Sequence, residues 1–411
     1  MIRNLAAFSI AVFIGLSLLN SLSNLTYADE KSAAMDNSFW HRNVIAVEGK
    51  IEDTSLLFIL DTGAGATILH KDYEHILPAS AKGAEVNLLT LSGVERRFAY
   101  ENIRVSIGKN PVQEGKAVVF DLSEVHKVSG LKVGAILGTD YLQRFAFTMQ
   151  DGIPNFTAPP VASPQETPTW PVSLNSAGCP EIPVEYPLLG IRNVTLDTGL
   201  TENLAISQAF ADTLIRSGDA QLMTRTKFLD MSGVKIKSVV TIRELKILGV
   251  QFRNIPAQVG TRNNVGLGLL RYINFTVDFP KGIAYLHGDA PKGQDKFPVD
   301  ASGLRVVWDE CGFYRIRRIE AGSAAANADL RLGDEIEAIS DLPTSTLSLW
   351  QIRQMLSQAG ETMKITLKRN GESRSVALPL KRDFEYPPVW NSRSLEAASF
   401  LDSLQQNSAN N

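Results

Sequence analysis

Short apolar runs, and runs that alternate between apolar and polar residues, recur along most of this chain, and both are typical of β-strands. Residues 44–51 alternate and residues 56–60 are continuously apolar. Acidic residues and glycine separate the two runs, as in a hairpin. The pattern therefore predicts a mainly β fold.

Three of these patterns occur twice in the same order. SLLFILDTGAGATIL recurs as GIRNVTLDTGLTENLAI, NLLTLSGVERRF as KFLDMSGVKIKS, and AILGTDYLQRFAFTMQD as NVGLGLLRYINFTVDF. The paired motifs lie 136, 140 and 128 positions apart. Because three motifs keep their order and nearly keep their spacing, we interpret them as a duplicated unit of about 120 residues. We place the copies at 29–153 and 172–292, joined by a Pro-, Ser- and Thr-rich linker at 154–171.

The pattern changes after Pro298. LRVVWDE and GFYRIRRI are predicted strands, EAGSAAANADLRLGDEI is a predicted turn-helix-turn, and SLWQIRQMLSQA has helical spacing. MKITLKRNGESRSVALPL is predicted to form a hairpin that turns at Asn370-Gly371. We assign residues 299–383 to a separate domain and residues 384–411 to a polar tail.

Composition narrows the function classes. The chain has 44% hydrophobic and 21% charged residues and a formal net charge of −3, without a block of Lys or Arg. That balance argues against a nucleic-acid partner. The two cysteines, Cys179 and Cys311, fall in different predicted domains, so two unpaired thiols are favoured over a disulfide, which stays open.

The N-terminus has the pattern of a signal peptide. Arg3 precedes an apolar stretch at 5–19, and a polar segment then leads to a small residue, Ala28. We predict a signal peptide at 1–28 and an exported protein, either periplasmic or secreted. The alternative is an uncleaved anchor, but the apolar stretch is shorter than the ~20 residues that a membrane span needs.

The repeated Asp-Thr-Gly carries the candidate chemistry. Two carboxylates held close together resist double ionisation, so one keeps a proton while the other can activate water. A strand that ends in Asp anchors the carboxylate, Thr can hydrogen-bond across to the opposite loop, and Gly lets the backbones approach closely. The candidate residues are Asp61, Thr62, Gly63, Asp197, Thr198 and Gly199.

These loops resemble the catalytic loops of retropepsin-like and pepsin-like aspartic proteases. Residues 136–138 resemble the apolar-apolar-Gly strand beneath the catalytic loop of that family, and the resemblance covers roughly residues 40–286. It implies two fused acid-protease lobes with pseudo-two-fold symmetry, no metal or cofactor, and peptide or protein substrates. We expect a monomer; lobes that pair between two chains are the alternative. The family's flaps would correspond to Leu91, Ser92, Gly93, Met231, Ser232 and Gly233.

The C-terminal domain resembles a PDZ domain of the type attached to bacterial envelope proteases. The motifs are EAGSAA from Glu320 and Gly333-Asp334-Glu-Ile336. The resemblance implies a groove for a C-terminal peptide between residues 313–319 and 347–356. The loop that binds the peptide carboxylate would lie at Gly312, Phe313 and Tyr314.

The sequence therefore predicts an aspartic endopeptidase of two retropepsin-like lobes followed by a PDZ domain. No His-Glu-x-x-His, Gly-x-Ser-x-Gly or phosphate-binding Gly-Lys-Ser/Thr motif offers another chemistry. The rival interpretation is a non-catalytic peptide-binding scaffold that uses the PDZ domain beside a relic cleft. The residues after the two Asp-Thr-Gly motifs are Ala64 and Leu200, where pepsin-like enzymes have Ser or Thr. Neither side chain can donate a hydrogen bond to a carboxylate, so we expect activity at mildly acidic to near-neutral pH.

Overall fold

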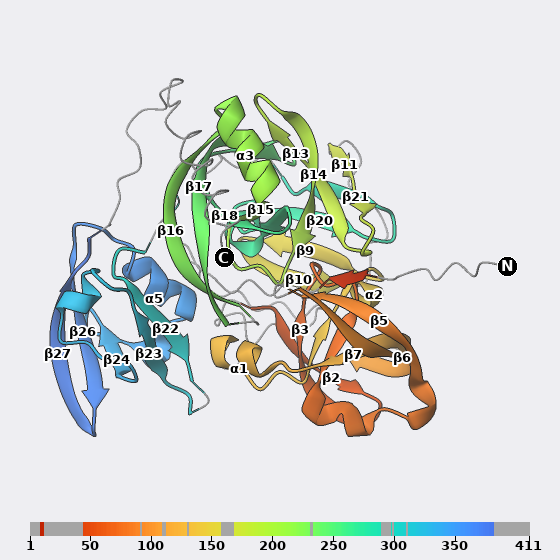
Figure 1. Cartoon of the computed structure of the whole chain (residues 1–411), viewed down its shortest axis with the longest axis horizontal. Coiled ribbons are helices and arrows are strands. Elements are labelled where there is room, and N and C mark those ends of the chain that lie inside the picture. Colours follow the sequence, from red (N-terminus) through yellow and green to blue (C-terminus); the bar gives the residue numbers. More distant parts are fainter. Residues whose placement is uncertain are drawn as a thin grey trace, which may run out of the picture.

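The computed structural model is mainly β (Figure 1). It describes residues 9–11, 44–90, 93–108, 112–129, 131–157, 168–230, 233–288, 297, 300–309 and 311–381. The proposed signal peptide lies outside these residues except for β1 (Ser9–Ala11), which pairs in parallel with β5. The polar tail also lies outside them. No helix in the described part of the chain is long and apolar enough to cross a membrane.

Seven strands from the first predicted copy form one sheet. They are β2 (Ala46–Ile51), β3 (Thr54–Leu60), β4 (Thr67–His70), β5 (Lys82–Thr90), β6 (Gly93–Ile107), β7 (Gln113–Phe120) and β8 (Ala135–Leu137). Six of them pair in a closed ring, β2-β3-β8-β4-β7-β6 and back to β2, and β5 extends the ring from β6. We call this the first ring.

The second predicted copy forms a sheet with the same pairings. Its strands are β13 (Pro180–Tyr186), β14 (Gly190–Asp197), β15 (Leu204–Ser207), β16 (Ala220–Asp230), β17 (Gly233–Ile247), β18 (Val250–Gly260) and β19 (Asn264–Gly266), with β12 (Ser173–Leu174) added at one edge. The closed order is β13-β14-β19-β15-β18-β17. The parallel pairs β3–β8 and β4–β7 have counterparts in β14–β19 and β15–β18. We call this the second ring.

A third sheet joins the two rings. Its order is β10 (Ile153–Thr157), β9 (Ala146–Gln150), β20 (Phe275–Asp278), β21 (Ile283–Leu286) and β11 (Thr169–Pro171). β9 pairs directly with β20, so the ends of both copies meet in one sheet. The segment predicted as a linker, 154–171, therefore enters this sheet at both ends, and only its middle part lies outside the described residues.

The helices around the rings are short. The predicted helix after Gly138 is α2 (Thr139–Leu142), and its counterpart after Gly266 is α4 (Leu267–Leu270). The others are α1 (Ser123–Ser129) in the first copy and α3 (Gln208–Ser217) in the second. Short 3-10 turns lie at Lys71–Ile76 and Ala79–Ala81.

One apolar core runs through both rings and the joining sheet. It contains side chains from the first ring such as Phe58, from the second ring such as Phe252, and from the joining sheet such as Phe147 and Phe275. Phe147 and Phe275 lie edge to face, with ring centroids 5.8 Å apart. Burial of this many apolar side chains against one another holds the two copies together as one body.

The C-terminal domain has a separate core. Its strands are β22 (Leu304–Trp308), β23 (Tyr314–Ile319), β24 (Glu335–Ile339), β25 (Leu342–Pro343), β26 (Thr362–Arg369) and β27 (Glu372–Pro379), with α5 (Leu349–Met355) and 3-10 turns at Ala325–Asn327 and Thr344–Thr346. The predicted hairpin turn is present: Asn370 and Gly371 have φ of 53° and 88°, as a two-residue turn between β26 and β27 requires. The domain lies at one side of the rings, where α1 contacts β22 (Figure 1).

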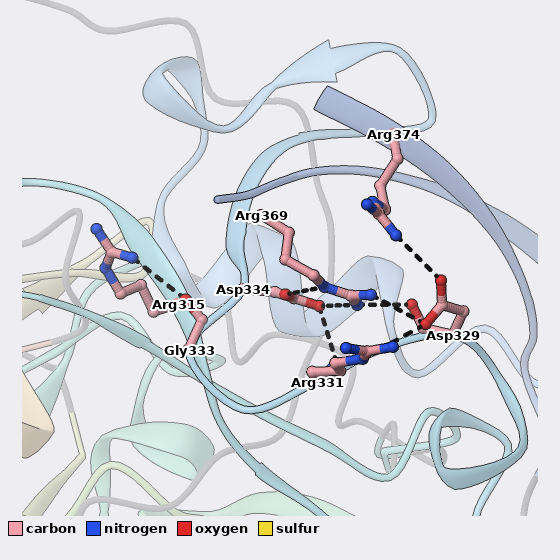
Figure 2. A network of polar contacts seen from close by, with 7 residues as sticks. All are labelled: Arg315, Asp329, Arg331, Gly333, Asp334, Arg369 and Arg374. Carbon is pink, nitrogen blue, oxygen red and sulfur yellow. Dashed lines mark hydrogen bonds and ion pairs between the residues drawn. The ribbon is translucent and has the colours of Figure 1, made fainter. Parts of the chain in front are cut away.

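A buried ion pair explains the Gly-Asp motif of this domain. Arg369 on β26 donates to both carboxylate oxygens of Asp334, at 2.8 and 2.7 Å, and also reaches Asp329 (Figure 2). Asp334 accepts a further bond from the backbone of Arg331. The Asp334 side chain is 2% exposed, so its charge depends on these partners.

We therefore expect Asp334→Asn to destabilise the C-terminal domain by about 3 kcal/mol, since it removes the buried charge partner of the Arg369 guanidinium and leaves it the more exposed Asp329. The control is Asp341→Asn, because Asp341 is 74% exposed and pairs with the exposed Lys364. Its expected cost is below about 1 kcal/mol. Denaturant unfolding measures both changes, and equal changes would contradict the assigned role of Asp334.

Candidate active site

The two Asp-Thr-Gly loops meet between the rings. β3 ends at Leu60, immediately before Asp61, and β14 ends at Asp197. Both aspartates have 0% exposure. A Cβ atom built on Gly63 would lie 2.4 Å from Cγ of Asp197, and one built on Gly199 would lie 2.5 Å from Cγ of Asp61. Each carboxyl thus packs directly on the glycine of the opposite loop.

The threonines link the loops reciprocally. Backbone N–H of Thr62 donates to Oγ1 of Thr198, and backbone N–H of Thr198 donates to Oγ1 of Thr62, each at 3.0 Å. Each hydroxyl then donates onward to the strand of the opposite loop, Thr62 to the carbonyl of Leu196 at 2.6 Å and Thr198 to that of Leu60 at 2.8 Å. These four bonds satisfy two buried hydroxyls and fix the two loops relative to each other.

The apolar-Gly strands lie beneath the loops, as the sequence predicts. Backbone N–H of Asp61 donates to the carbonyl of Leu137 on β8, and Asp197 is paired with Gly266 on β19. A Cβ atom on Gly138 would lie 2.5 Å from the backbone of Ala66, so only glycine fits there without a backbone shift. A Cβ atom on Gly266 would be equally close to a backbone carbonyl, at 2.3 Å.

The carboxyls of Asp61 and Asp197 have different partners. Asp61 accepts a bond of 2.8 Å at Oδ1 from the N–H of Gly63. Asp197 accepts two backbone bonds of 2.9 Å at Oδ1, from Gly199 and Leu200. Its Oδ2 also accepts a 2.6 Å bond from the side-chain amide of Asn264.

Burial dominates the acidity of this pair. Desolvation, the largest cause, and the nearby charge of Asp197 raise the pKa of Asp61 well above its usual value. Desolvation also raises the pKa of Asp197, but the amide of Asn264 and the shared contact with Asp61 oppose that rise. The arrangement can therefore hold one proton between two carboxyls near neutral pH.

Both hairpins predicted as flaps are present as strand pairs. β5 and β6 pair antiparallel up to Thr90 and Gly93, and β16 and β17 up to Asp230 and Gly233. The turn residues Leu91, Ser92, Met231 and Ser232 lie outside the described residues. The structure thus brings together the dyad and its supporting residues, and it leaves the tips of the predicted flaps undescribed.

The residues predicted to line the peptide groove lie on an inner strand of the C-terminal sheet and on the turn before it, and not at the sheet edge beside the helix. Gly312 and Phe313 lie between β22 and β23, and Tyr314 begins β23, which pairs with β22 on one side and with β24 on the other. The sheet ends at β22, and α5 packs against that strand. The placement between β23 and the helix is therefore wrong, because the edge strand beside α5 is β22.

Two residues near the dyad were missed by the motif analysis. Asn264 aligns with Ile136 of the first copy, so the change from apolar to amide was visible once the two repeats were set side by side. Cys179 is buried and donates from Sγ to the carbonyl of Gly63 at 3.3 Å. Cys179 and Cys311 are both free, as favoured from the sequence. Among the described residues, no group of three or more His, Cys, Asp or Glu side chains is placed to hold a metal ion.

Comparisons with known proteins add little to this geometry. No family model matches the chain, and no curated protein matches it. A solved structure of a photosystem II D1 C-terminal processing protease aligns with 22% identity over 22% of this chain and 24% of its own, with a TM-score of 0.19. The chain thus spans about a quarter of that protein. Basic 7S globulin from soybean aligns with 9% identity over 62% of this chain and 94% of its own, with a TM-score of 0.37.

Proposed function

We propose that this chain is an aspartic endopeptidase of two retropepsin-like lobes, the first ring and the second ring, which carries a PDZ domain at its C-terminus. One observation carries the proposal: two buried carboxyls, Asp61 and Asp197, each rest on the glycine of the opposite loop. The reciprocal threonine bonds hold them there. Burying two mutually repelling carboxyls against each other costs free energy, and two purely structural turns do not require it.

The chemistry follows from one shared proton. The ionised carboxyl takes a proton from a water molecule as the water oxygen attacks the peptide carbonyl carbon. The protonated carboxyl gives its proton to the carbonyl oxygen, which forms a tetrahedral diol. As the diol collapses and the C–N bond breaks, the carboxyl that accepted the water proton gives it to the departing amine. One diol hydroxyl returns its proton to the other carboxyl, which releases the product acid and restores the shared proton. Thr62 and Thr198 hold the two carboxyls in position through these steps. The β5–β6 and β16–β17 hairpins would cover the substrate.

The C-terminal domain would bind a peptide by adding it as a strand. The edge strand β22 and helix α5 would form that groove in place of the strand expected from the sequence. In the present arrangement, Arg353 of α5 donates to the carbonyl of Val306 on β22 at 3.4 Å. A bound peptide would have to displace this contact.

The pH range of the proposed activity follows from the raised pKa values. Desolvation raises both carboxyl pKa values, so the pair keeps its shared proton to higher pH than exposed carboxyls do. A hydroxyl at Ala64, which is buried beside the loop, could donate to the ionised form and lower the pKa of the pair. We therefore expect Ala64→Ser to move the acidic limb of the pH–rate profile downward by up to about one unit.

The control for this prediction is Ala211→Ser, which adds a buried hydroxyl on α3, outside the Asp-Thr-Gly loops. The limbs report the coupled pair and not one carboxyl alone. A limb that rises or stays in place in Ala64→Ser would contradict the expected role of a hydroxyl beside the carboxyls.

Digestion of a peptide library by the purified full chain tests the proposed function. We expect cleavage at internal bonds, which mass spectrometry of the products detects. A chain that binds peptides at the C-terminal domain and leaves every peptide intact at pH 4 to 7 would instead be the non-catalytic scaffold.

A further inference from the structure

One position beneath the dyad differs between the two rings. β8 pairs with β3 so that Leu137 lies opposite Leu60, and β19 pairs with β14 so that Val265 lies opposite Leu196. The preceding residues, Ile136 and Asn264, therefore occupy equivalent positions. Ile136 has 0% exposure, so an apolar residue satisfies this position of the fold in the first ring.

The amide side chain of Asn264 occupies a buried position, where an unpaired polar atom is unfavourable. It is 2% exposed, and its Nδ2 donates to Oδ2 of Asp197 at 2.6 Å. Its Oδ1 is buried and has no hydrogen-bond partner among the described residues. Burying an amide with an unpaired oxygen costs free energy that an aliphatic side chain would avoid. The benefit of Asn264 must therefore come from its bond to Asp197.

We propose that Asn264 fixes the roles of the two carboxyls, so that Asp197 is the ionised base and Asp61 carries the shared proton. This inference rests on the proposed function for its catalytic meaning. A donor at 2.6 Å stabilises the ionised form of the group it contacts, and the equivalent side chain beside Asp61, Ile136, has no donor. Asn264 is a positioning residue, because it acts on the substrate only through Asp197.

The other charged and titratable groups facing Asp197 in the described part of the chain agree with this assignment. Arg262, which precedes β19, attracts the Asp197 carboxylate. Burial, together with the charges of the two aspartates, raises the pKa of Cys179 to about 12, so its thiol is neutral and adds no charge. The shared proton removes the negative charge of Asp61, which otherwise interacts with that of Asp197.

This assignment gives each carboxyl a defined role in hydrolysis. Asp197 accepts the proton from the attacking water, and Asp61 donates its proton to the carbonyl oxygen of the scissile bond. The amide orientation matters as well. If the carbonyl oxygen of Asn264 faced Asp197 instead, the contact would favour the protonated form of Asp197, and the two roles would be exchanged.

The test is a carboxyl titration of the full chain by NMR, with ¹³C at Cγ of aspartate. Loss of a signal in Asp61→Asn or Asp197→Asn assigns the two resonances. In the unaltered chain we expect Asp197 to ionise at lower pH than Asp61. In Asn264→Leu, which keeps the size and removes the donor, the Asp197 midpoint should rise by about one pH unit. Ile136→Leu is the matched control, because it changes the equivalent side chain without changing any donor, and both midpoints should stay in place.

The possible outcomes of this titration are distinguishable. Ionisation of Asp61 before Asp197 in the unaltered chain would overturn the assignment, and so would an Asp197 midpoint that Asn264→Leu leaves unchanged. If Asn264→Leu does not fold, the order of ionisation in the unaltered chain still decides. The titration needs no substrate, so the predicted order in a chain that cleaves no peptide would contradict the proposed function and leave the role of Asn264 standing.

Discussion

Asn in place of Asp61 or of Asp197 is expected to reduce peptide cleavage at least about 10³-fold. The isosteric amide keeps the bond from the N–H of Gly63 or Gly199 but cannot share the proton. In the proposed mechanism the two carboxyls act as one unit, so either substitution should cost about as much as both together. Initial rates on one cleaved peptide measure the loss.

The same variants should remain folded, which separates loss of chemistry from loss of structure. Desolvation raises the pKa of both carboxyls. A raised folded-state pKa stabilises the protein only at low pH, and this contribution is lost as the pH rises through that pKa. At neutral pH we therefore expect each variant to unfold at the same denaturant concentration as the unaltered chain, or at a higher one. A folded variant that keeps near-normal turnover would show that the carboxyls do not form one site.

A single methyl group at Gly199 is expected to cause a smaller but still large loss of activity. In Gly199→Ala the new Cβ would lie 2.5 Å from Cγ of Asp61, so the carboxyl or the loop must move. A displacement of about 1 Å at a reacting group can cost about 10²-fold in rate. We expect a loss of that size in kcat, and the same from Gly63→Ala, whose Cβ would lie 2.4 Å from Cγ of Asp197.

Gly260→Ala is the matched control for this steric prediction. It lies at the end of β18 in the second ring, and a Cβ atom there meets nothing within 4 Å. Cleavage rates of Gly260→Ala should therefore match those of the unaltered chain. Equal rates in Gly199→Ala and Gly260→Ala would mean that the Asp61 carboxyl does not need its observed position.

Much of this architecture could be predicted because the repeats expose it. Three local patterns occur in both copies: the strand before each Asp-Thr-Gly, the glycine beneath each loop, and the short helix after that glycine. The cross-loop threonine bonds were also predictable, since a threonine beside a buried carboxyl in each copy has few other partners.

The sequence was less informative where an outcome depends on which strands become neighbours. The groove was assigned to β23, because its turn carries Gly312 and Phe313, whereas tertiary pairing leaves β22 at the edge beside α5. The linker ends became β10 and β11 because β9 and β21 offer them pairing edges. Pro-, Ser- and Thr-rich composition does not reveal such edges.

We propose that Asp61 and Asp197 together hydrolyse peptide bonds. A comparison of the unaltered chain with Asp197→Asn on one peptide library, each with and without pepstatin, tests this proposal. Pepstatin presents a hydroxyl where the attacking water would be held by the two carboxyls, so it should block a shared site. If the two aspartates form one hydrolytic site, the unaltered chain makes internal cleavages that pepstatin abolishes and that Asp197→Asn does not make. Cleavage that persists in both the inhibited chain and the variant would contradict it.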